Sequence, residues 1–196
     1  MHNQVINFLN QVKSKIPKAF NGVKALDIGS FNVNGSVKDF FEYSTVLGID
    51  LMSGPDVDIV CPANEYTGAN ESFDTIISCE CWEHNPFYKE TILNSIRMLK
   101  PKGCFIWTCA STGRPAHGTA TQDLIDCDKG QTLQGTKINN WISMPNVKKQ
   151  NWDNDYYKNV TIKDCINLFD YDSVFSSYCF EFNSDHSDLY FWGIKN

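Results

Sequence analysis

The stretch Ala25-Leu26-Asp27-Ile28-Gly29-Ser30, residues 25–30, decides the fold class of this chain. Its apolar run contains one acidic residue and ends at a glycine, which is typical of a buried strand that enters a tight turn. Glycine has no Cβ, so the backbone at Gly29 can approach a ligand closely. In open α/β sheets, ligands bind beyond the carboxyl ends of the strands. The stretch therefore predicts an α/β protein with a ligand site beside Asp27 and Gly29.

A second acidic strand end follows at Asp50. The apolar run 46–51 predicts a strand and places Asp50 21 residues after Gly29. An acid at about this spacing commonly accepts hydrogen bonds from ribose hydroxyls, although a lone aspartate at a strand end also serves as a helix cap or a surface turn. The spacing G-x-G-x-x-G that holds a pyrophosphate is missing. Two carboxylates without a glycine-rich phosphate-binding loop suit a nucleoside that carries an ammonium group and no phosphate.

Strands and helices alternate along much of the chain. This alternation favours a Rossmann-like α/β three-layer sandwich, with a mostly parallel seven-stranded sheet and a C-terminal antiparallel hairpin. The turn Lys100-Pro101-Lys102-Gly103 should separate a helix from the next strand. We expect helices over 5–16, 34–43, 86–99 and 162–169, and strands over 23–28, 46–51, 57–60, 73–78, 104–109, 174–182 and 189–194.

The length of the chain favours a single domain. Its 196 residues fall within the about 100–200 residues of one typical domain, so we treat 1–196 as one unit with an N-terminal helix within 1–20. The segment 111–157 is polar, rich in Gly, Asn and Thr, and without a clear period. Long irregular segments in compact domains are usually functional. We expect this one to form an irregular insertion on the substrate side.

Charge and cysteine content narrow the range of partners. The net charge is −6 and no dense basic cluster occurs, which disfavours a nucleic-acid partner. We find neither a signal peptide nor a membrane span, so we expect a cytoplasmic protein with no membrane partner. The eight cysteines lack the paired spacing of a zinc site, and several lie in apolar runs. We therefore expect neither disulfides nor a metal.

Three stretches, read in order, resemble a known family. They are ALDIGSFNVNGSV (25–37), VLGIDLMSGPDVDIV (46–60) and SFDTIISCECWEHNPFYKETILNSIRMLKPKGCFIWT (72–108). Together they resemble the class I S-adenosylmethionine-dependent methyltransferases, in particular the small bacterial, methyltransferase-11-like type whose first loop reads GSxxVNGS. The later stretches NDYYKNVT and DLYFWGIK are similar to that type too. The resemblance implies S-adenosyl-L-methionine as the cofactor and methyl transfer as the activity.

The resemblance also assigns residues to the cofactor. Those at the end of the first strand should line its methionine part, Asp50 should bind the ribose, and Met52 and Ala63 should lie near the adenine. Glu80, after the fourth strand, should border the sulfonium. One departure is Pro62, at a position where an acidic residue often binds the adenine amine. The implied cofactor residues are Asp27, Gly29, Ser30, Phe31, Asn34, Gly35, Ser36, Asp50, Leu51, Met52, Ala63, Asn64, Cys79 and Glu80.

Four side chains near the strand ends are candidates for catalysis. Glu83 and His84 follow the fourth strand, and Arg114 and His117 lie in STGRPAHGT (111–119), after the fifth. A histidine there can act as a base near neutral pH, and an arginine can hold an anionic group through two hydrogen bonds. The same residues can instead pack, cap the next helix or order the loop.

No motif identifies the acceptor. The polar segment 111–157, dotted with aromatic residues, favours a small polar molecule such as a sugar or a glycan precursor, and Tyr156 and Tyr157 are candidates for binding it, or for packing. A nucleic-acid methyltransferase is an alternative, although Asn85-Pro86-Phe87 reads better as a helix start than as a base-methylation motif. A cofactor-binding protein without turnover and a nicotinamide oxidoreductase are further alternatives.

Overall fold

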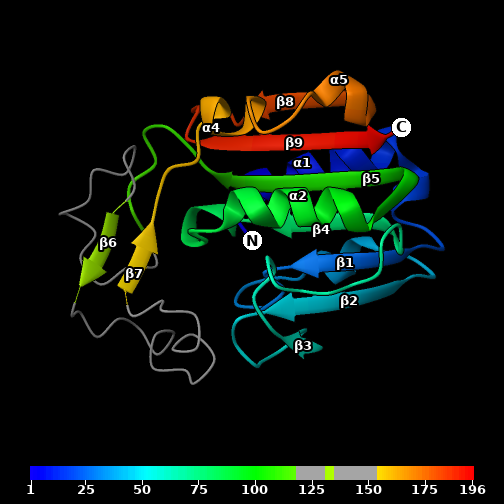
Figure 1. The fold of residues 1–196 in the computed structure, drawn as a ribbon, viewed down its shortest axis with the longest axis horizontal. Helices are drawn as coiled ribbons and strands as arrows, with labels where there is room; N and C mark the ends of the chain where they lie inside the picture. The colour runs from blue at the N-terminus through cyan, green and yellow to red at the C-terminus, as the bar shows by residue number, and fades with distance from the viewer. Residues whose placement is uncertain (118–130, 135–153) are drawn as a thin grey trace.

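The computed structural model describes residues 1–117, 131–134 and 154–196. A seven-stranded sheet is formed by β1 (Lys24–Ile28), β2 (Thr45–Asp50), β3 (Ile59–Val60), β4 (Phe73–Cys79), β5 (Leu99–Ala110), β8 (Phe175–Phe182) and β9 (Asp188–Lys195). The strand order is β3-β2-β1-β4-β5-β9-β8 (Figure 1). β1 to β5 are parallel to one another, whereas β9 is antiparallel to both β5 and β8. The predicted fold class, including the C-terminal hairpin, is confirmed.

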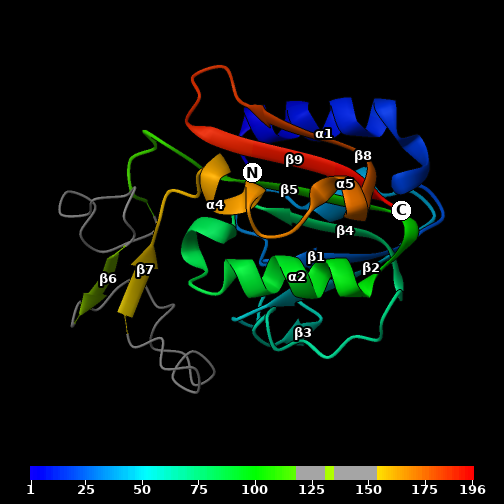
Figure 2. The ribbon, with the colours of Figure 1, turned by 45° about the horizontal axis from the view of Figure 1, so that its top comes forward.

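Helices cover both faces of the sheet (Figure 2). They are α1 (Asn3–Lys15), α2 (Tyr88–Met98), α4 (Ile162–Ile166) and α5 (Tyr171–Val174). α1 buries a stripe at helical spacing on one face, where Phe8 packs on Tyr190 of β9 at 4.7 Å between ring centroids. On the other face, Ile92 of α2 and Tyr171 of α5 share a buried cluster with Trp107 of β5. The central strands are therefore covered on both sides, as a parallel sheet requires.

The segment after β1 forms a short 3-10 helix, η2 (Val37–Phe40), and the α-helix predicted over 34–43 is wrong. The helix stops because Phe41 is extended, with φ −93° and ψ 136°. Glu42 then forms an isolated parallel bridge with Asn21. The bridge draws the chain toward the start of β2 and leaves no room for further helical turns.

The turn predicted at Lys100–Gly103 lies inside β5. Phe73 of β4 pairs with Leu99, and Thr75 pairs with Cys104, so the register shifts between these two pairs. The four residues 100–103 therefore bulge out of the ladder while the strand continues. The predicted strand start at 104 is corrected to Leu99.

Two other segments differ from their predictions. The helix predicted over 162–169 ends at Ile166, and Asp170 caps the separate helix α5 by accepting from the amides of Asp172 and Ser173. The segment 111–157, predicted to be irregular, contains β6 (Gln131–Gln134) and β7 (Asn154–Tyr157), which pair as a two-stranded antiparallel sheet. Residues 118–130 and 135–153 of that segment lie outside the described part of the chain.

The strand order reverses between β1 and β4. From β1 the chain continues outward through β2 and β3, and it then returns to the other side of β1 as β4 and β5. The loops at the carboxyl ends of β1 and β4 consequently diverge and leave a crevice between them. Within the described residues, no helix combines the length and the apolar character needed to cross a bilayer.

Candidate functional site

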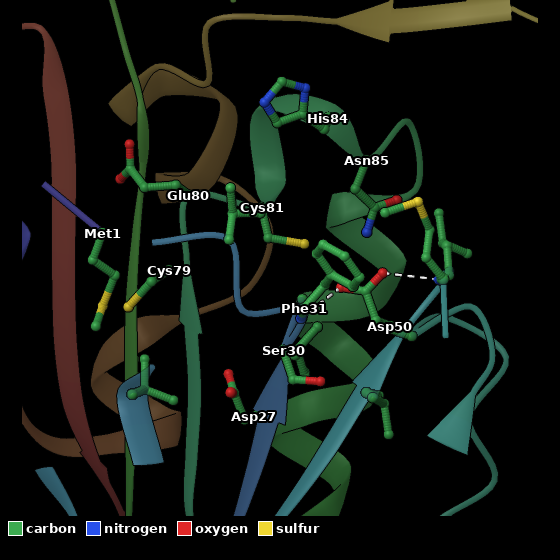
Figure 3. A pocket seen from close by; sticks show the side chains of 18 of the residues that line it. Met1, Asp27, Ser30, Phe31, Asp50, Cys79, Glu80, Cys81, His84 and Asn85 are labelled. Carbon is green, nitrogen blue, oxygen red and sulfur yellow. Dashed lines mark hydrogen bonds between the residues drawn. The ribbon is translucent and has the colours of Figure 1, made fainter. Parts of the chain in front are cut away.

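A cavity of about 480 Å³ opens beyond the carboxyl ends of β1, β2 and β4 (Figure 3). It lies where the strand order reverses, which is where open α/β sheets bind ligands. The predicted cofactor residues that line it are Asp27, Gly29, Ser30, Phe31, Asn34, Gly35, Ser36, Asp50, Leu51, Met52, Ala63, Cys79 and Glu80. The predicted catalytic or substrate residues that line it are His84, Arg114, His117 and Tyr156. Asn64, Glu83 and Tyr157 lie outside its lining.

Gly29 shapes the turn after β1. Its φ of +79° falls in the left-handed region that favours glycine. The amides of Gly29 and Ser30 both donate to the carbonyl of Ile49, at 2.9 and 3.1 Å. A Cβ on Gly29 would lie 2.9 Å from Sγ of Cys81, so the glycine lets the turn pack against the segment after β4. Ser30 Oγ is buried without a hydrogen-bond partner among the described residues, and a ligand in the cavity could supply that partner.

Asp50 is fixed by the backbone around it. Its Oδ2 accepts from the amide of Phe31 at 3.1 Å, and its Oδ1 accepts from the amide of Met52 at 3.0 Å. Burial raises the pKa of Asp50, and these amides act in the opposite direction. A carboxylate has about four lone-pair sites. The sites that these amides leave open can accept from the hydroxyl groups of a ligand.

Asp27 lines the same cavity and is more deeply buried. Its side chain lies between β1 and β4 (Figure 3), and the residue is only 3% exposed. Burial raises the pKa of Asp27 to about 8, while Lys38 opposes the increase and Asp50 adds to it. A cationic group of a ligand beside Asp27 would favour its ionised form. Asp27 and Asp50 are therefore two distinct acidic positions in one cavity.

Glu80 forms the opposite wall, within a network that the sequence analysis did not predict. Its φ of +53° is uncommon for a residue with a side chain. Nε2 of His2 lies 3.4 Å from Oε2 of Glu80 and 3.4 Å from Oδ2 of Asp188. Burial alone would raise the pKa of Glu80, but hydrogen bonds from His2 and Thr108 lower it below its ordinary value. Arg114 donates to Asp188 at 2.6 Å, so its guanidinium already has an anionic partner.

The histidine cluster, defined as Glu83, His84 and His117, lies next to this network. Glu83 and His84 belong to the 3-10 helix η3 (Trp82–His84) after β4, and His117 follows β5. The two imidazole rings are 5.3 Å apart between centroids and nearly perpendicular, at 87°. Burial lowers the pKa of His84 to about 3 and also lowers that of His117, so both imidazoles are neutral at pH 7.

Glu83 is the most buried member of this cluster, with no exposed surface. Burial raises its pKa well above the ordinary value, Glu80 adds to the increase, and the amides of Glu83 and Ala110 oppose it. Oε1 of Glu83 lies 3.8 Å from Nε2 of His117. Neither carboxylate oxygen has a partner in hydrogen-bond geometry among the described residues.

Three thiols also line the cavity. Cys79 and Cys81 follow one another on the wall formed by the end of β4 (Figure 3), and Cys61 lies on the β3 side. Burial raises the pKa of Cys61 to about 11 and raises those of Cys79 and Cys81 further. All three are free thiols, as predicted from the sequence.

Comparison with known proteins agrees with this architecture. No protein-family profile matches the chain, and no curated protein sequence does. Among solved structures, a 1,6-didemethyltoxoflavin-N1-methyltransferase from Burkholderia thailandensis, crystallised with 1,6-didemethyltoxoflavin and S-adenosylhomocysteine, superposes with a TM-score of 0.62 at 14% identity, over 99% of this chain and 79% of that one. An S-adenosylmethionine-dependent methyltransferase from Mesorhizobium loti superposes with a TM-score of 0.55 at 12% identity, over 95% and 96% of the two chains.

The chain has the class I methyltransferase fold.

This methyltransferase fold also supports other chemistry. The [4+2]-cyclase SpnF superposes on the chain with a TM-score of 0.55 at 11% identity, over 92% of this chain and 60% of that one. Function must therefore be argued from the site. Among the described residues that line the cavity, Arg114 is the only side chain with a permanent positive charge, and Asp188 neutralises it. None of those described side chains therefore offers an unpaired permanent cation to a phosphate.

Several lining residues of this methyltransferase fold were not predicted. Cys81 and Asn85 had a weak signal, because they lie within a few residues of predicted positions in the loop after β4. His2 had no signal at all, since it reaches the site from a position 78 residues before Glu80. The unpredicted lining residues are Met1, His2, Ile28, Val33, Val37, Ile49, Cys61, Cys81 and Asn85.

Proposed function

We propose that this chain transfers a methyl group from S-adenosylmethionine to a small polar acceptor, such as a sugar or a glycan precursor. The observation that carries the proposal is that Asp27 and Asp50 line one cavity, where Asp188 neutralises Arg114, the one permanently cationic side chain among the described residues of the lining. Such a cavity disfavours phosphates and suits a nucleoside that carries an ammonium group. S-adenosylmethionine has this chemistry, and solved structures of the same fold contain its product S-adenosylhomocysteine.

The cavity walls fit the cofactor part by part. Asp27 would pair with its ammonium group, and Ser30 Oγ, which lacks a partner among the described residues, would hydrogen-bond its amino-acid end. The remaining lone-pair sites of Asp50 would accept from the ribose hydroxyls. Leu51 and Met52 would flank the adenine. When bound, the cofactor supplies an electrophilic methyl group on a sulfonium.

The histidine cluster would receive the acceptor. His84 and His117 line the cavity with their ring centroids 5.3 Å apart, and Figure 3 places His84 in the segment after β4, away from the β2 wall that Asp50 provides. In-line methyl transfer depends mainly on the alignment of acceptor, methyl group and sulfur. The unprotonated Nε2 of His117 could accept a proton from an acceptor hydroxyl or amine. Tyr156 would close the same side of the cavity.

Binding and label transfer test the proposal against its alternatives. Calorimetry should detect S-adenosylmethionine and S-adenosylhomocysteine but not NADH, which a nicotinamide oxidoreductase would bind. Tritium from the methyl group of S-adenosylmethionine should then appear in the small-molecule fraction of a cell extract. Label in the nucleic-acid fraction would favour the nucleic-acid alternative instead, and binding without any label transfer would favour a protein without turnover.

Asp50→Ala should weaken S-adenosylmethionine binding by roughly 1–3 kcal/mol, because hydrogen bonds to the ribose are lost. Isothermal titration calorimetry measures the change directly. Asp39→Ala is the matched control, since Asp39 is an exposed carboxylate on η2 that does not line the cavity. Equal affinities of Asp50→Ala and Asp39→Ala would contradict the role of Asp50.

His117→Ala should lower label transfer by about 100-fold or more, the typical contribution of a group that handles a proton. Its affinity for S-adenosylmethionine should stay within about twofold of the parent, because the proposed cofactor contacts lie at the other strand ends. His186→Ala, which changes an exposed histidine in the β8–β9 loop, provides the control. Unchanged transfer by His117→Ala would remove this residue from the mechanism.

A further inference from the structure

The histidine cluster contains a buried acid, Glu83, whose ionised form is favoured only weakly, by the nearby backbone amides of Glu83 and Ala110. Glu83 has no exposed surface, and neither of its oxygens has a hydrogen-bond partner among the described residues. A buried carboxylate normally has hydrogen bonds, a counter-ion or a metal, because burial of a bare charge is costly. Nε2 of His117 lies 3.8 Å from Oε1 of Glu83, which is too long for a hydrogen bond.

The tautomer of His117 determines which of its two ring nitrogens can bind an ion. Nδ1 of His117 lies 3.1 Å from the carbonyl oxygen of Pro115, and a carbonyl oxygen can only accept, so Nδ1 carries the proton. The hydroxyl of Tyr157 lies near the same two atoms, 3.2 Å from Nδ1 and 3.3 Å from the Pro115 oxygen. Nε2 therefore keeps its lone pair, and it lies 3.8 Å from Oε1 of Glu83.

His84 completes a set of three ligand atoms. One nitrogen of His84, one nitrogen of His117 and one oxygen of Glu83 all lie within 4.8 Å of one another. With metal–nitrogen bonds of about 2.0–2.1 Å, two imidazoles on a tetrahedral ion would have ring centroids about 5 Å apart. The observed separation is 5.3 Å. A carbonyl that fixes the second nitrogen of a ligating imidazole is also the usual support of a metal site.

We propose that Glu83, His84 and His117 bind a divalent transition-metal ion, with zinc the best match to two imidazoles and one carboxylate. Imidazole donors favour zinc over magnesium and calcium, which prefer oxygen ligands. Because His84 and His117 line the cavity, the fourth coordination position opens toward it. The expectation of no metal, drawn from cysteine spacing, did not consider this histidine–carboxylate set.

A second group of potential ligands is a poorer site. His2, Glu80 and Asp188 also bring three ligand atoms together. Arg114, however, donates to Asp188 at 2.6 Å and supplies the positive charge that this group needs. A metal ion there would be repelled by the guanidinium. Among the described residues, no lysine or arginine forms an ion pair with Glu83 within 4.0 Å, although Arg114 acts on it from a greater distance.

The ion would define the chemical class of the acceptor, and this step rests on the proposed function. A hydroxyl bound at the open position loses its proton more readily, as water does on zinc. The proton leaves to bulk water, the oxygen electron pair forms the new C–O bond, and the C–S bonding pair returns to sulfur as the sulfonium becomes a thioether. His117 then promotes the loss of the acceptor proton as a ligand of the ion, in place of accepting that proton on its own Nε2. The acceptor is accordingly an alcohol.

Metal analysis of the full-length protein tests the site. After dialysis against Zn²⁺ or Co²⁺ and then buffer, the parent should retain about one ion per chain, and the Co²⁺ form should show d–d absorption without a thiolate charge-transfer band. Two variants, Glu83→Gln, which keeps the shape of the side chain, and His117→Ala, should each bind the metal ion more weakly than the parent. Changing a residue that only orients a metal ligand typically weakens metal binding by about 10–100-fold, and the loss in each of these variants should be larger. His186→Ala should retain the ion.

Each remaining outcome overturns the inference. The parent could retain no ion, or a thiolate band could assign the ion to the cysteines. Glu83→Gln and His117→Ala could both keep full metal occupancy, or the ion could be lost from His2→Ala but not from His117→Ala. Calorimetry with S-adenosylmethionine on the metal-free protein separates this test from the proposed function. Cofactor binding without a metal site leaves the methyltransferase proposal intact, whereas a metal site without cofactor binding leaves only the metal inference.

Discussion

Asp27→Asn is expected to raise the melting temperature of the cofactor-free protein at pH 8, and the gain should shrink as the pH is lowered. Burial raises the pKa of Asp27 from 3.8 to about 8, whereas the unfolded carboxyl ionises near its ordinary value. Between these two values, folding makes the carboxyl take up a proton, so the free energy of unfolding falls as the pH rises toward 8. Asparagine does not titrate. At pH 8, the free energy of unfolding of Asp27→Asn should exceed that of the parent by about 1 kcal/mol or more. Each kcal/mol corresponds to a rise of roughly 2–4 °C in the melting temperature at this chain length, which thermal denaturation measures.

The same substitution should weaken S-adenosylmethionine binding by about 30-fold or more, as expected for the loss of one partner in a buried charge pair. The ionised form of Asp27 is the one that would bind an ammonium group, so the affinity of the parent should increase between pH 6 and pH 8. The affinity of Asp27→Asn should not follow this trend. Asp39→Asn should behave as the parent in both assays. A stabilised Asp27→Asn protein with parental affinity would support the titration of Asp27 and contradict its role in binding.

Gly29→Ala is expected to destabilise the protein more than the same replacement at Gly22, Gly35 or Gly113, the other described glycines with a positive φ. A left-handed conformation costs a residue with a side chain about 1–2 kcal/mol. Overpacking against Sγ of Cys81, 2.9 Å from the added Cβ, should cost about 1–3 kcal/mol more. Urea denaturation should detect the sum, and the cavity wall at Ser30 should be displaced with it.

Gly22 offers a matched control within the same chain. Its φ is +67°, close to the +79° of Gly29, but a Cβ there would meet no atom within 4 Å. Gly22→Ala should therefore show only the conformational cost. In a Cys81→Ala background, which removes Sγ, the difference between the two glycine variants should narrow. If both alanine variants lose the same stability in the parent background, close packing at Gly29 is not the cause.

The strand ends could be predicted because their chemistry is local. An apolar run that stops at an acid or a glycine indicates where a strand leaves the core, and Asp27 and Asp50 fall at two such points. Parallel neighbours bring their carboxyl ends to one edge of a sheet. The cavity beside these residues could therefore be expected before its shape was known.

Other features depend on contacts between distant residues. The helix predicted over 34–43 was replaced by η2 because the Asn21–Glu42 bridge extends the backbone, and no pattern within the helix window reveals that bridge. The His2–Glu80–Asp188 group joins three separate parts of the chain. For Arg114, the sequence showed a free cation in a loop, and only the fold revealed its pairing with Asp188.

The cysteines in the cavity wall would lie close to a bound methyl donor that can alkylate thiolates. A sulfonium methyl donor is an alkylating agent, and thiolates are among the strongest nucleophiles that a protein contains. With a pKa of about 11, only about one Cys61 side chain in 10,000 would be ionised at pH 7, and burial suppresses Cys79 and Cys81 further. Desolvation thus keeps these sulfurs as unreactive thiols. Methylation of these cysteines by the bound cofactor would therefore be slow, even though the cysteines line the cavity.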